Sequence, residues 1–259
     1  PGKTHSEAEL QQQNEAELAD LAAHPIPADR DKWGGWAEGP KLKATGRFRV
    51  EKVDGHWWLV DPDGHLFWSH GIDCVHSGNA TTPITDREHY FAELPKDDSP
   101  LAQFYGKAGW APHGYYEGKG EYRTFNFTGA NLYRKFGENW KTLHDQRSHD
   151  RLHSWGMNTV ANWSDRAVCA MQKTPYTATV SFSSPVIEGS TGYWGKFPDP
   201  FDPGFDQSLR RSVGWLRNNV DSWCIGVFVG NELAWQDDLS LGKGTLASPE
   251  NQPAKQAMI

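Results

Sequence analysis

Residues 157–182, MNTVANWSDRAVCAMQKTPYTATVSF, decide the fold class of this chain. The segment 157–163 is typical of a strand, 165–172 of a short helix and 176–182 of a second strand. Strands joined by a helix run parallel, because the helix returns the chain to the end at which the first strand began. The pattern therefore predicts an α/β fold built around a parallel sheet.

Two more apolar segments add strands to this sheet. Residues 66–75 are nearly continuous in apolar character, which is typical of a buried parallel strand, and 223–229 form a further apolar run. Helical spacing predicts helices at 131–155 and at about 206–220. Four strands with helices between them fit a (β/α)8 TIM barrel or a doubly wound sheet. No Gly-x-Gly-x-x-Gly follows any strand, and polar residues at the strand ends favour the barrel.

The N-terminal part of the chain follows a different pattern. Residues 6–24 predict an amphipathic helix with Ser6 as its N-cap, and a turn-rich connector follows it. Asp54-Gly55 stands between two segments of alternating polarity, which predicts a β-hairpin. The expected organisation is a helical arm and connector at 1–45, a β-hairpin at 46–65 and the first half of a (β/α)8 barrel at 66–259, with a long aromatic loop at 76–129.

The charge of the chain argues against two classes of partner. Its 259 residues carry a formal net charge of −7 at pH 7, without a basic stripe, so we expect no binding to nucleic acid or to a membrane. No segment has the roughly 18 consecutive apolar residues of a membrane span. The first residues do not resemble a secretory signal. The compartment stays open, and a secreted or periplasmic location is favoured if a leader has been removed.

We expect neither a metal site nor a cofactor. His76, His89 and His113 are scattered through the long loop, and with Cys74 they do not have the spacing of metal ligands. The three cysteines of the chain form no Cys-x-x-Cys pair, so a redox motif is not indicated either.

Aromatic residues are unusually frequent, since 13 Trp, 8 Tyr and 12 Phe make up 13% of the chain. Many of them lie in segments rich in Gly and Pro, which leaves two explanations open. Long loops need side chains to bury, and flat indole faces stack on the apolar faces of sugar rings. Trp163, Trp194 and Trp235 border strand ends or Gly-flanked loops, so they are candidates for sugar binding, with simple packing as the alternative.

Glu232 is the strongest candidate for a catalytic residue. It follows the apolar run 224–229 at the end where active sites of parallel barrels lie. Partial burial would keep its carboxyl protonated near neutral pH, as a general acid must be to protonate a leaving glycosidic oxygen. Asn231 beside it could hydrogen-bond a substrate hydroxyl. The alternative is a solvated Glu that opens the next loop, with Asn231 as its turn residue.

Other polar residues lie on the predicted strand 66–75, or at the end of the predicted strand 157–163 and just beyond it. His70 and Asn162 are expected either to contact substrate or the catalytic Glu, or to be satisfied polar groups inside the barrel. For Asp73 and Asp165 a structural role is favoured, because Asp165 is well placed to cap the helix that follows it.

Asn-Glu at the end of a fourth strand resembles the acid/base signature of clan A glycoside hydrolases. Four segments in order resemble the β-agarases of glycoside hydrolase family 50 and their uncharacterised relatives: GRFRVEKVDGHWWLVDPDGHLFWSHGIDCV at 46–75, VANWSD at 160–165, TGYWGKFPDPFDP at 191–203 and WCIGVFVGNELAW at 223–235. The resemblance extends over 46–259. It implies a retaining hydrolase of β-linked galactans in which Glu232 is the acid/base and Asn231 its substrate-binding neighbour.

The same resemblance implies that the second carboxylate lies beyond this chain. In the clan, the nucleophilic Glu ends the seventh strand, whereas the sequence here offers four barrel strands. We therefore expect the chain to need the remainder of the barrel as a partner, together with an oligo- or polysaccharide substrate. Two other functions stay open at this point: a clan A β-glycosidase of another specificity, such as a β-galactosidase-like enzyme, and a non-catalytic carbohydrate-binding relative.

Overall fold

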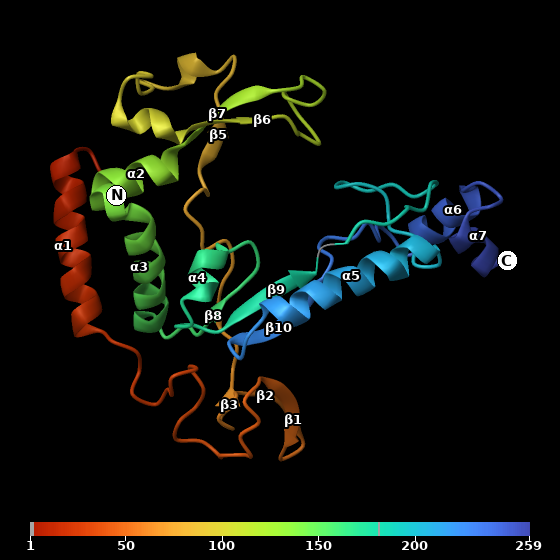
Figure 1. Ribbon diagram of the computed structural model, residues 1–259, viewed down its shortest axis with the longest axis horizontal. Helices are drawn as coiled ribbons and strands as arrows, with labels where there is room; N and C mark the ends of the chain where they lie inside the picture. The colour runs from red at the N-terminus through yellow and green to blue at the C-terminus, as the bar shows by residue number, and fades with distance from the viewer. Residues whose placement is uncertain (1–2, 181) are drawn as a thin grey trace. The chain divides into compact units, whose positions relative to one another are not determined.

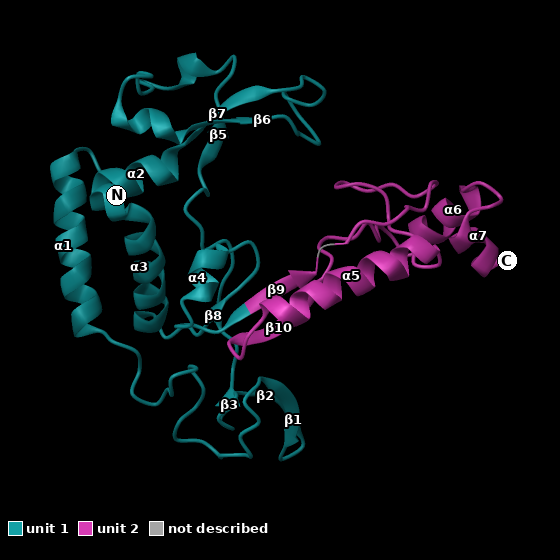
Figure 2. Ribbon diagram, in the orientation of Figure 1, with its two compact units in different colours: residues 1–176 teal, residues 177–259 magenta. Residues whose placement is uncertain are grey.

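The computed structural model describes residues 3–180 and 182–259 (Figure 1). The chain divides into two compact units, residues 1–176 and 177–259 (Figure 2). The helices of the first unit are α1 (Glu7–Ala23), α2 (Phe127–Phe136), α3 (Trp140–Ser154) and α4 (Arg166–Ala170), with 3-10 turns η1 (Glu88–Tyr90), η2 (Pro100–Phe104) and η3 (Gly137–Asn139). No helix in the described part of the chain is long and apolar enough to cross a membrane.

An antiparallel sheet of three strands follows the connector. Its strands are β1 (Arg49–Val53), β2 (His56–Val60) and β3 (Leu66–Phe67), in the order β1-β2-β3. Asp54 and Gly55 have φ values of 48° and 84° and form the turn between β1 and β2. Two successive positive φ values are what a tight hairpin turn requires, so the hairpin is the structure that Asp-Gly predicts.

Parallel pairing begins after this hairpin. β4 (Gly71–Ile72) pairs parallel with β8 (Thr159–Val160), and Val160 of β8 pairs parallel with Tyr176, the first residue of β9 (Tyr176–Val180). Helix α4 connects β8 to β9, as the strand–helix–strand pattern predicts. A Cβ at residue 71 would lie 1.8 Å from the Thr159 carbonyl oxygen, so only Gly allows β4 this close to β8. The α/β fold class is confirmed.

The prediction of one continuous strand at 66–75 is wrong. Leu66 pairs antiparallel with Val60, whereas Gly71 pairs parallel with Thr159, so the segment forms two short strands in two sheets. The buried side chain of Asn158 binds the backbone between them, at the Trp68 carbonyl and the His70 amide. Those backbone groups are therefore unavailable for a strand ladder.

The segment predicted as a long aromatic loop, 76–129, contains a second antiparallel sheet. Its strands, β5 (Thr81–Pro83), β6 (Tyr105–Ala108) and β7 (Tyr122–Asn126), lie in the order β5-β7-β6. Many of the aromatic side chains are packed rather than displayed. The core of this part consists of Ile84, Phe104, Phe125, Ala130 and Trp140.

Helix α1 forms where the sequence predicts it, and the Ser6 side chain accepts a hydrogen bond from the Glu9 amide as its N-cap. None of its residues, all of which the structure describes, is buried. Ion pairs attach it instead: Glu17 binds Arg151, Lys135 at 2.8 Å and Arg147 at 3.1 Å. Burial alone would raise the pKa of Glu17, but the hydrogen bonds and charges of Arg151 and Lys135 lower it to about 2.

The second unit contains the rest of β9, α5 (Pro203–Asn219), β10 (Cys224–Val229), α6 (Ser240–Ala247) and α7 (Pro253–Met258). Pro203 begins α5, and the Asp202 side chain accepts from the Gly204 amide. β10 is the neighbour of β9. An apolar strand of this kind is normally buried, but Val227, Phe228 and Val229 are all about half exposed in the chain as described.

The ion pairs of Glu17 generate a prediction about pH. Because its pKa is lowered on folding, the pairs stabilise the native state above pH 4.5, and this contribution disappears as the pH falls toward 2. We expect Glu17→Gln to reduce the free energy of unfolding at pH 7 by about 1–2 kcal/mol, a value discounted for the partial exposure of the site. Urea unfolding followed by circular dichroism measures this difference.

Glu15→Gln is the matched control, because Glu15 lies on the same helix and is exposed. This variant should change the free energy of unfolding little at pH 7 and at pH 2.5. A destabilisation by Glu17→Gln that is equally large at pH 7 and at pH 2.5 would contradict the electrostatic account.

Candidate functional site

A turn after β10 positions the candidate acid. Gly230 has a φ of 73° and Glu232 a φ of 46°, so the chain leaves the strand through two left-handed residues. This conformation is uncommon for a residue with a side chain, and strained residues of this kind cluster at functional sites. Glu232 and the adjacent Asn231 are exposed, so the partial burial expected for Glu232 is not present in the described structure.

The carboxylate of Glu232 has a defined partner in the loop before α5. The indole Nε1–H of Trp194 donates a hydrogen bond to its Oε2. Trp194 is itself half exposed, and the Tyr193 ring packs edge-on against it with 4.7 Å between the ring centroids. A carboxylate and two aromatic side chains therefore lie together on an accessible part of the second unit.

Three further contacts hold the same loop against the turn after β10. The Gln236 amide donates to the Thr191 hydroxyl at 2.9 Å. The ring of Trp235 packs at 65° against Phe197, with 4.6 Å between the centroids. At Gly192, a Cβ would lie 2.2 Å from the Cβ of Ala234. Contacts before Trp194, at Thr191 and Gly192, and after it, at Phe197, thus fix the loop that carries Trp194.

Other carboxylates of the second unit have structural partners. Glu188 forms an ion pair with Lys196 at 2.8 Å. Asp199 is fully buried and accepts hydrogen bonds from the Gln252 side chain at 2.6 Å and from the Ala254 amide at 3.0 Å. Asp199 therefore organises the start of α7, and Glu188 is neutralised by a lysine.

In the first unit, Asn162 and Trp163 follow β8. Asn162 is buried, and its carbonyl accepts from the Cys74 amide at 2.8 Å. Trp163 has a φ of 58° and is more than half exposed. A buried amide and an exposed indole thus follow the strand.

His70 occupies a different position from the one expected. It precedes β4 rather than ending the strand, and its backbone pairs with Asn158 through hydrogen bonds of 2.9 and 2.7 Å. It therefore lies level with the start of β8, whereas Cys74 lies level with Asn162. The expected strand 66–75 carried His70 within it, whereas the observed division of that segment leaves His70 just before β4.

Asp165 was expected to cap the helix that follows it, and its side chain instead stabilises another segment of the first unit. Its side chain makes no cap hydrogen bond to α4 among the described residues. Instead its Oδ2 accepts from the Ser77 amide at 3.1 Å, which fixes the segment that leaves β4.

Sequence reasoning missed Tyr193, Gln236 and Thr191, which complete the surroundings of Glu232 and Trp194. One signal was available for Tyr193, because Gly192 and Gly195 flank the pair Tyr193-Trp194 as they would an ordered aromatic loop. No local pattern identifies the other two residues, since their side chains meet only in the folded chain.

No family model matches the chain. Among curated proteins, β-agarase B of Vibrio sp. (strain JT0107) is 37% identical over 265 residues, which cover 91% of this chain and 27% of that protein. The structure of PfGH50B superposes with a TM-score of 0.88 at 30% identity, over 99% of this chain and 41% of that one. The structure of an exo-β-agarase superposes with a TM-score of 0.86, also at 30% identity, over 99% and 41%.

The chain spans less than half the length of each of these relatives. The similarity of sequence and of structure nevertheless covers at least nine tenths of this chain. The homologues of this chain are β-agarases, and its structural neighbours are agarases of glycoside hydrolase family 50.

Proposed function

We propose that this chain is part of a retaining glycoside hydrolase of agarase type, which cleaves β-linked galactans. One observation carries the proposal: a carboxylate, Glu232, stands in a left-handed turn after an apolar strand and is bound to the indole of Trp194. Glycosidases need a carboxyl group beside the scissile bond, and aromatic side chains bind sugar rings. The β-agarase relatives support the substrate class.

In the proposed reaction, Glu232 acts first as an acid and then as a base. Its carboxyl protonates the glycosidic oxygen as the leaving sugar departs, and its carboxylate later removes a proton from the attacking water. The hydrogen bond from Trp194 orients one carboxylate oxygen, which leaves the other for the substrate. Asn231 hydrogen-bonds the substrate 2-hydroxyl in this scheme, where the contact strengthens in an oxocarbenium-like transition state.

The nucleophile of a retaining hydrolase lies roughly 5–5.5 Å from the acid/base. We infer that it is a Glu outside the given chain, on a later strand of a (β/α)8 clan A barrel whose first half this chain forms. The half-exposed apolar side chains of Val227, Phe228 and Val229 support this inference. A strand with exposed apolar side chains needs cover from further strands and helices.

Substrate contacts are proposed for five more residues. Trp194 and Trp235 are about half exposed, beside the Glu232 turn, and present indole surfaces to a sugar. In the first unit, Trp163 is equally exposed, and Asn162 offers an amide at the end of β8. His70, which lies just before β4, is the fifth residue proposed to contact the substrate.

The role of Glu232 predicts the effect of its amide variant. In the full-length protein that contains this chain, Glu232→Gln should lower the rate of agarose and neoagaro-oligosaccharide cleavage by about 10²–10⁴-fold, because the amide cannot transfer the proton. Reducing-end release measures the rate. Oligosaccharide binding, measured by calorimetry, should persist.

Glu188→Gln is the control, since Glu188 pairs with Lys196 in the same unit and should leave the rate nearly unchanged. Undiminished cleavage of an unactivated substrate by Glu232→Gln would refute the assignment. A wild-type protein that binds these glycans without cleaving them would support the non-catalytic alternative, and preferential cleavage of aryl β-galactosides would support the β-galactosidase-like one.

The retaining mechanism predicts the anomer that forms first. Cleavage of a β-linkage through two displacements gives a β-product, which then mutarotates. Proton NMR of the wild-type reaction should therefore show β-anomer signals before α-anomer signals. The opposite order would establish inversion and remove the covalent intermediate from the scheme.

The contact between Trp194 and Glu232 predicts a separate effect on turnover. Trp194→Phe keeps an aromatic face for a sugar but removes the N–H donor. We expect kcat to fall about tenfold, the order of magnitude of one lost hydrogen bond to a charged group, with KM changed much less. Trp215→Phe, on α5, is the control. A change confined to KM would show that Trp194 binds substrate without orienting Glu232.

A further inference from the structure

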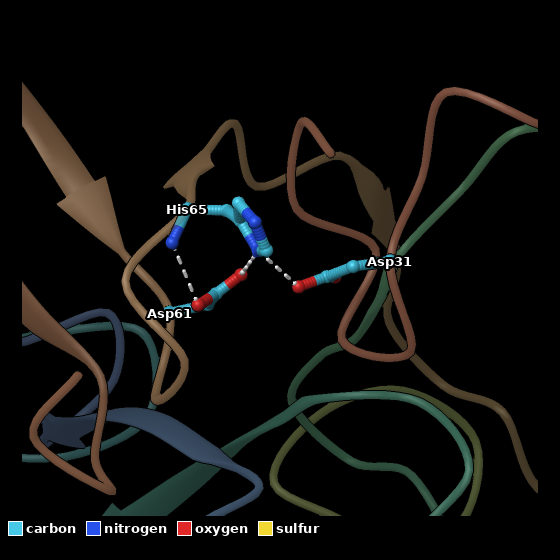
Figure 3. A group of neighbouring side chains, drawn as sticks. All are labelled: Asp31, Asp61 and His65. Atoms are coloured by element: carbon cyan, nitrogen blue, oxygen red, sulfur yellow. Dashed lines mark hydrogen bonds and ion pairs between the residues drawn. The ribbon is translucent and has the colours of Figure 1, made fainter. Parts of the chain in front are cut away.

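Three side chains with metal-binding atoms meet in the first unit, outside the candidate site described above. Asp31 lies in the connector after α1, and Asp61 and His65 lie in the turn between β2 and β3 (Figure 3). One oxygen of each carboxylate and a ring nitrogen of His65 all lie within 4.8 Å of one another. The Asp61 side chain is fully buried, and those of Asp31 and His65 are each 12% exposed.

Backbone amides hold both carboxylates in place. Asp61 Oδ1 accepts hydrogen bonds from the amides of Asp63, Gly64 and His65 at 2.8–3.0 Å. Asp31 Oδ1 accepts from the amides of Trp33 and Gly35 at 2.9 and 2.8 Å. Each carboxylate thus uses one oxygen to organise its own turn and presents the other, Oδ2, toward His65. This is the arrangement by which a second shell orients metal ligands.

The inner oxygen of Asp61 lacks a hydrogen bond. Asp31 Oδ2 lies 2.8 Å from His65 Nδ1, but Asp61 Oδ2 lies 3.7 Å from it and has no hydrogen-bond partner among the described residues. A Cβ at Gly35 would lie 2.2 Å from this oxygen, so the backbone closes the cluster on that side. An unsatisfied buried acceptor destabilises the fold, and more so when it is charged.

The two carboxylates also repel each other. Both carboxylates face one imidazole in a place that water hardly reaches, since Asp61 is fully buried and the other two side chains are each 12% exposed. Lys32 does not neutralise them directly, because its ammonium pairs at 2.8 Å with Asp63 at the surface. A divalent cation between the three side chains would neutralise both charges and give Asp61 Oδ2 its missing partner.

We propose that Asp31, Asp61 and His65 bind one divalent metal ion, with zinc as the best match. Two carboxylate oxygens and one imidazole nitrogen suit zinc and its neighbours among the transition metals, whereas magnesium and calcium prefer oxygen ligands alone. Ligand atoms about 2.1 Å from a tetrahedral zinc are roughly 3.4 Å apart. The nitrogen–oxygen separations of 2.8 and 3.7 Å lie on either side of that value.

The ion would have a structural role. It would join the connector at Asp31 to the turn at Asp61 and His65, and so attach the N-terminal part of the chain to the β1-β2-β3 sheet. Binding takes the Nδ1 lone pair of His65, so the imidazole proton resides on Nε2 in the metal-bound form. Nothing in this role depends on the proposed hydrolase activity.

Calorimetric titration of the full chain with zinc chloride, after treatment with a chelator, tests the proposal. We expect one equivalent to bind and to raise the melting temperature. Asp61→Asn should weaken binding by about 100-fold or more, because the variant keeps the Oδ1 acceptor for the turn but loses a charged ligand. Asp63→Asn, a neighbour in the same turn whose side chain is outside the cluster, should bind zinc as the wild type does.

X-ray absorption of the zinc-loaded wild type gives a result that does not depend on the folding of a variant. The proposal expects oxygen and nitrogen neighbours at about 2.0–2.2 Å and no sulfur. A sulfur shell near 2.3 Å would place zinc on the cysteines and overturn the proposal. No binding, or equal binding by the wild type and a folded Asp61→Asn, would also overturn it and leave a carboxylate pair that shares a proton.

Discussion

The buried side chain of Asn158 is the contact on which the arrangement of the first unit depends. Its amide donates to the carbonyls of Gly34 and Trp68 at 2.9 and 3.0 Å, and its oxygen accepts from the His70 amide at 2.9 Å. One side chain thereby joins the connector, the segment between β3 and β4, and the start of β8. Because a buried amide is destabilising when any partner is missing, these three segments are held in position together.

Local chemistry made part of this structure predictable. The turn at Asp54-Gly55 and the strand–helix–strand pattern at 157–182 specify a hairpin and a parallel pairing through residues close in sequence. The division of 66–75 into two strands was not predictable in this way. It depends on Asn158, which is 88 residues from His70. The sheet β5-β7-β6 escaped detection because its strands have three to five residues and its core includes Ala130 and Trp140 from later helices.

The candidate site shows the same limit. Glu232 could be identified because an apolar run ends just before it, but its partner Trp194 comes from a loop 38 residues earlier. The exposure of Glu232 could not be predicted from the apolar character of β10, because the burial of a strand end depends on which other segments cover it. Asp31 and His65 are 34 residues apart and carry no metal-binding spacing, so their cluster emerges only when the connector folds against the hairpin turn.

The ends of three strands share a backbone feature that bears on function. Cys74 after β4, Trp163 after β8 and Glu232 after β10 have φ values of 54°, 58° and 46°. A left-handed residue with a side chain is unfavourable by about 1–2 kcal/mol, and the turn could be made without this strain by Gly. At Trp163 and Glu232, an indole and a carboxylate stand where a stable fold alone would favour Gly, and the proposed roles of these two residues in binding and chemistry would account for the strain.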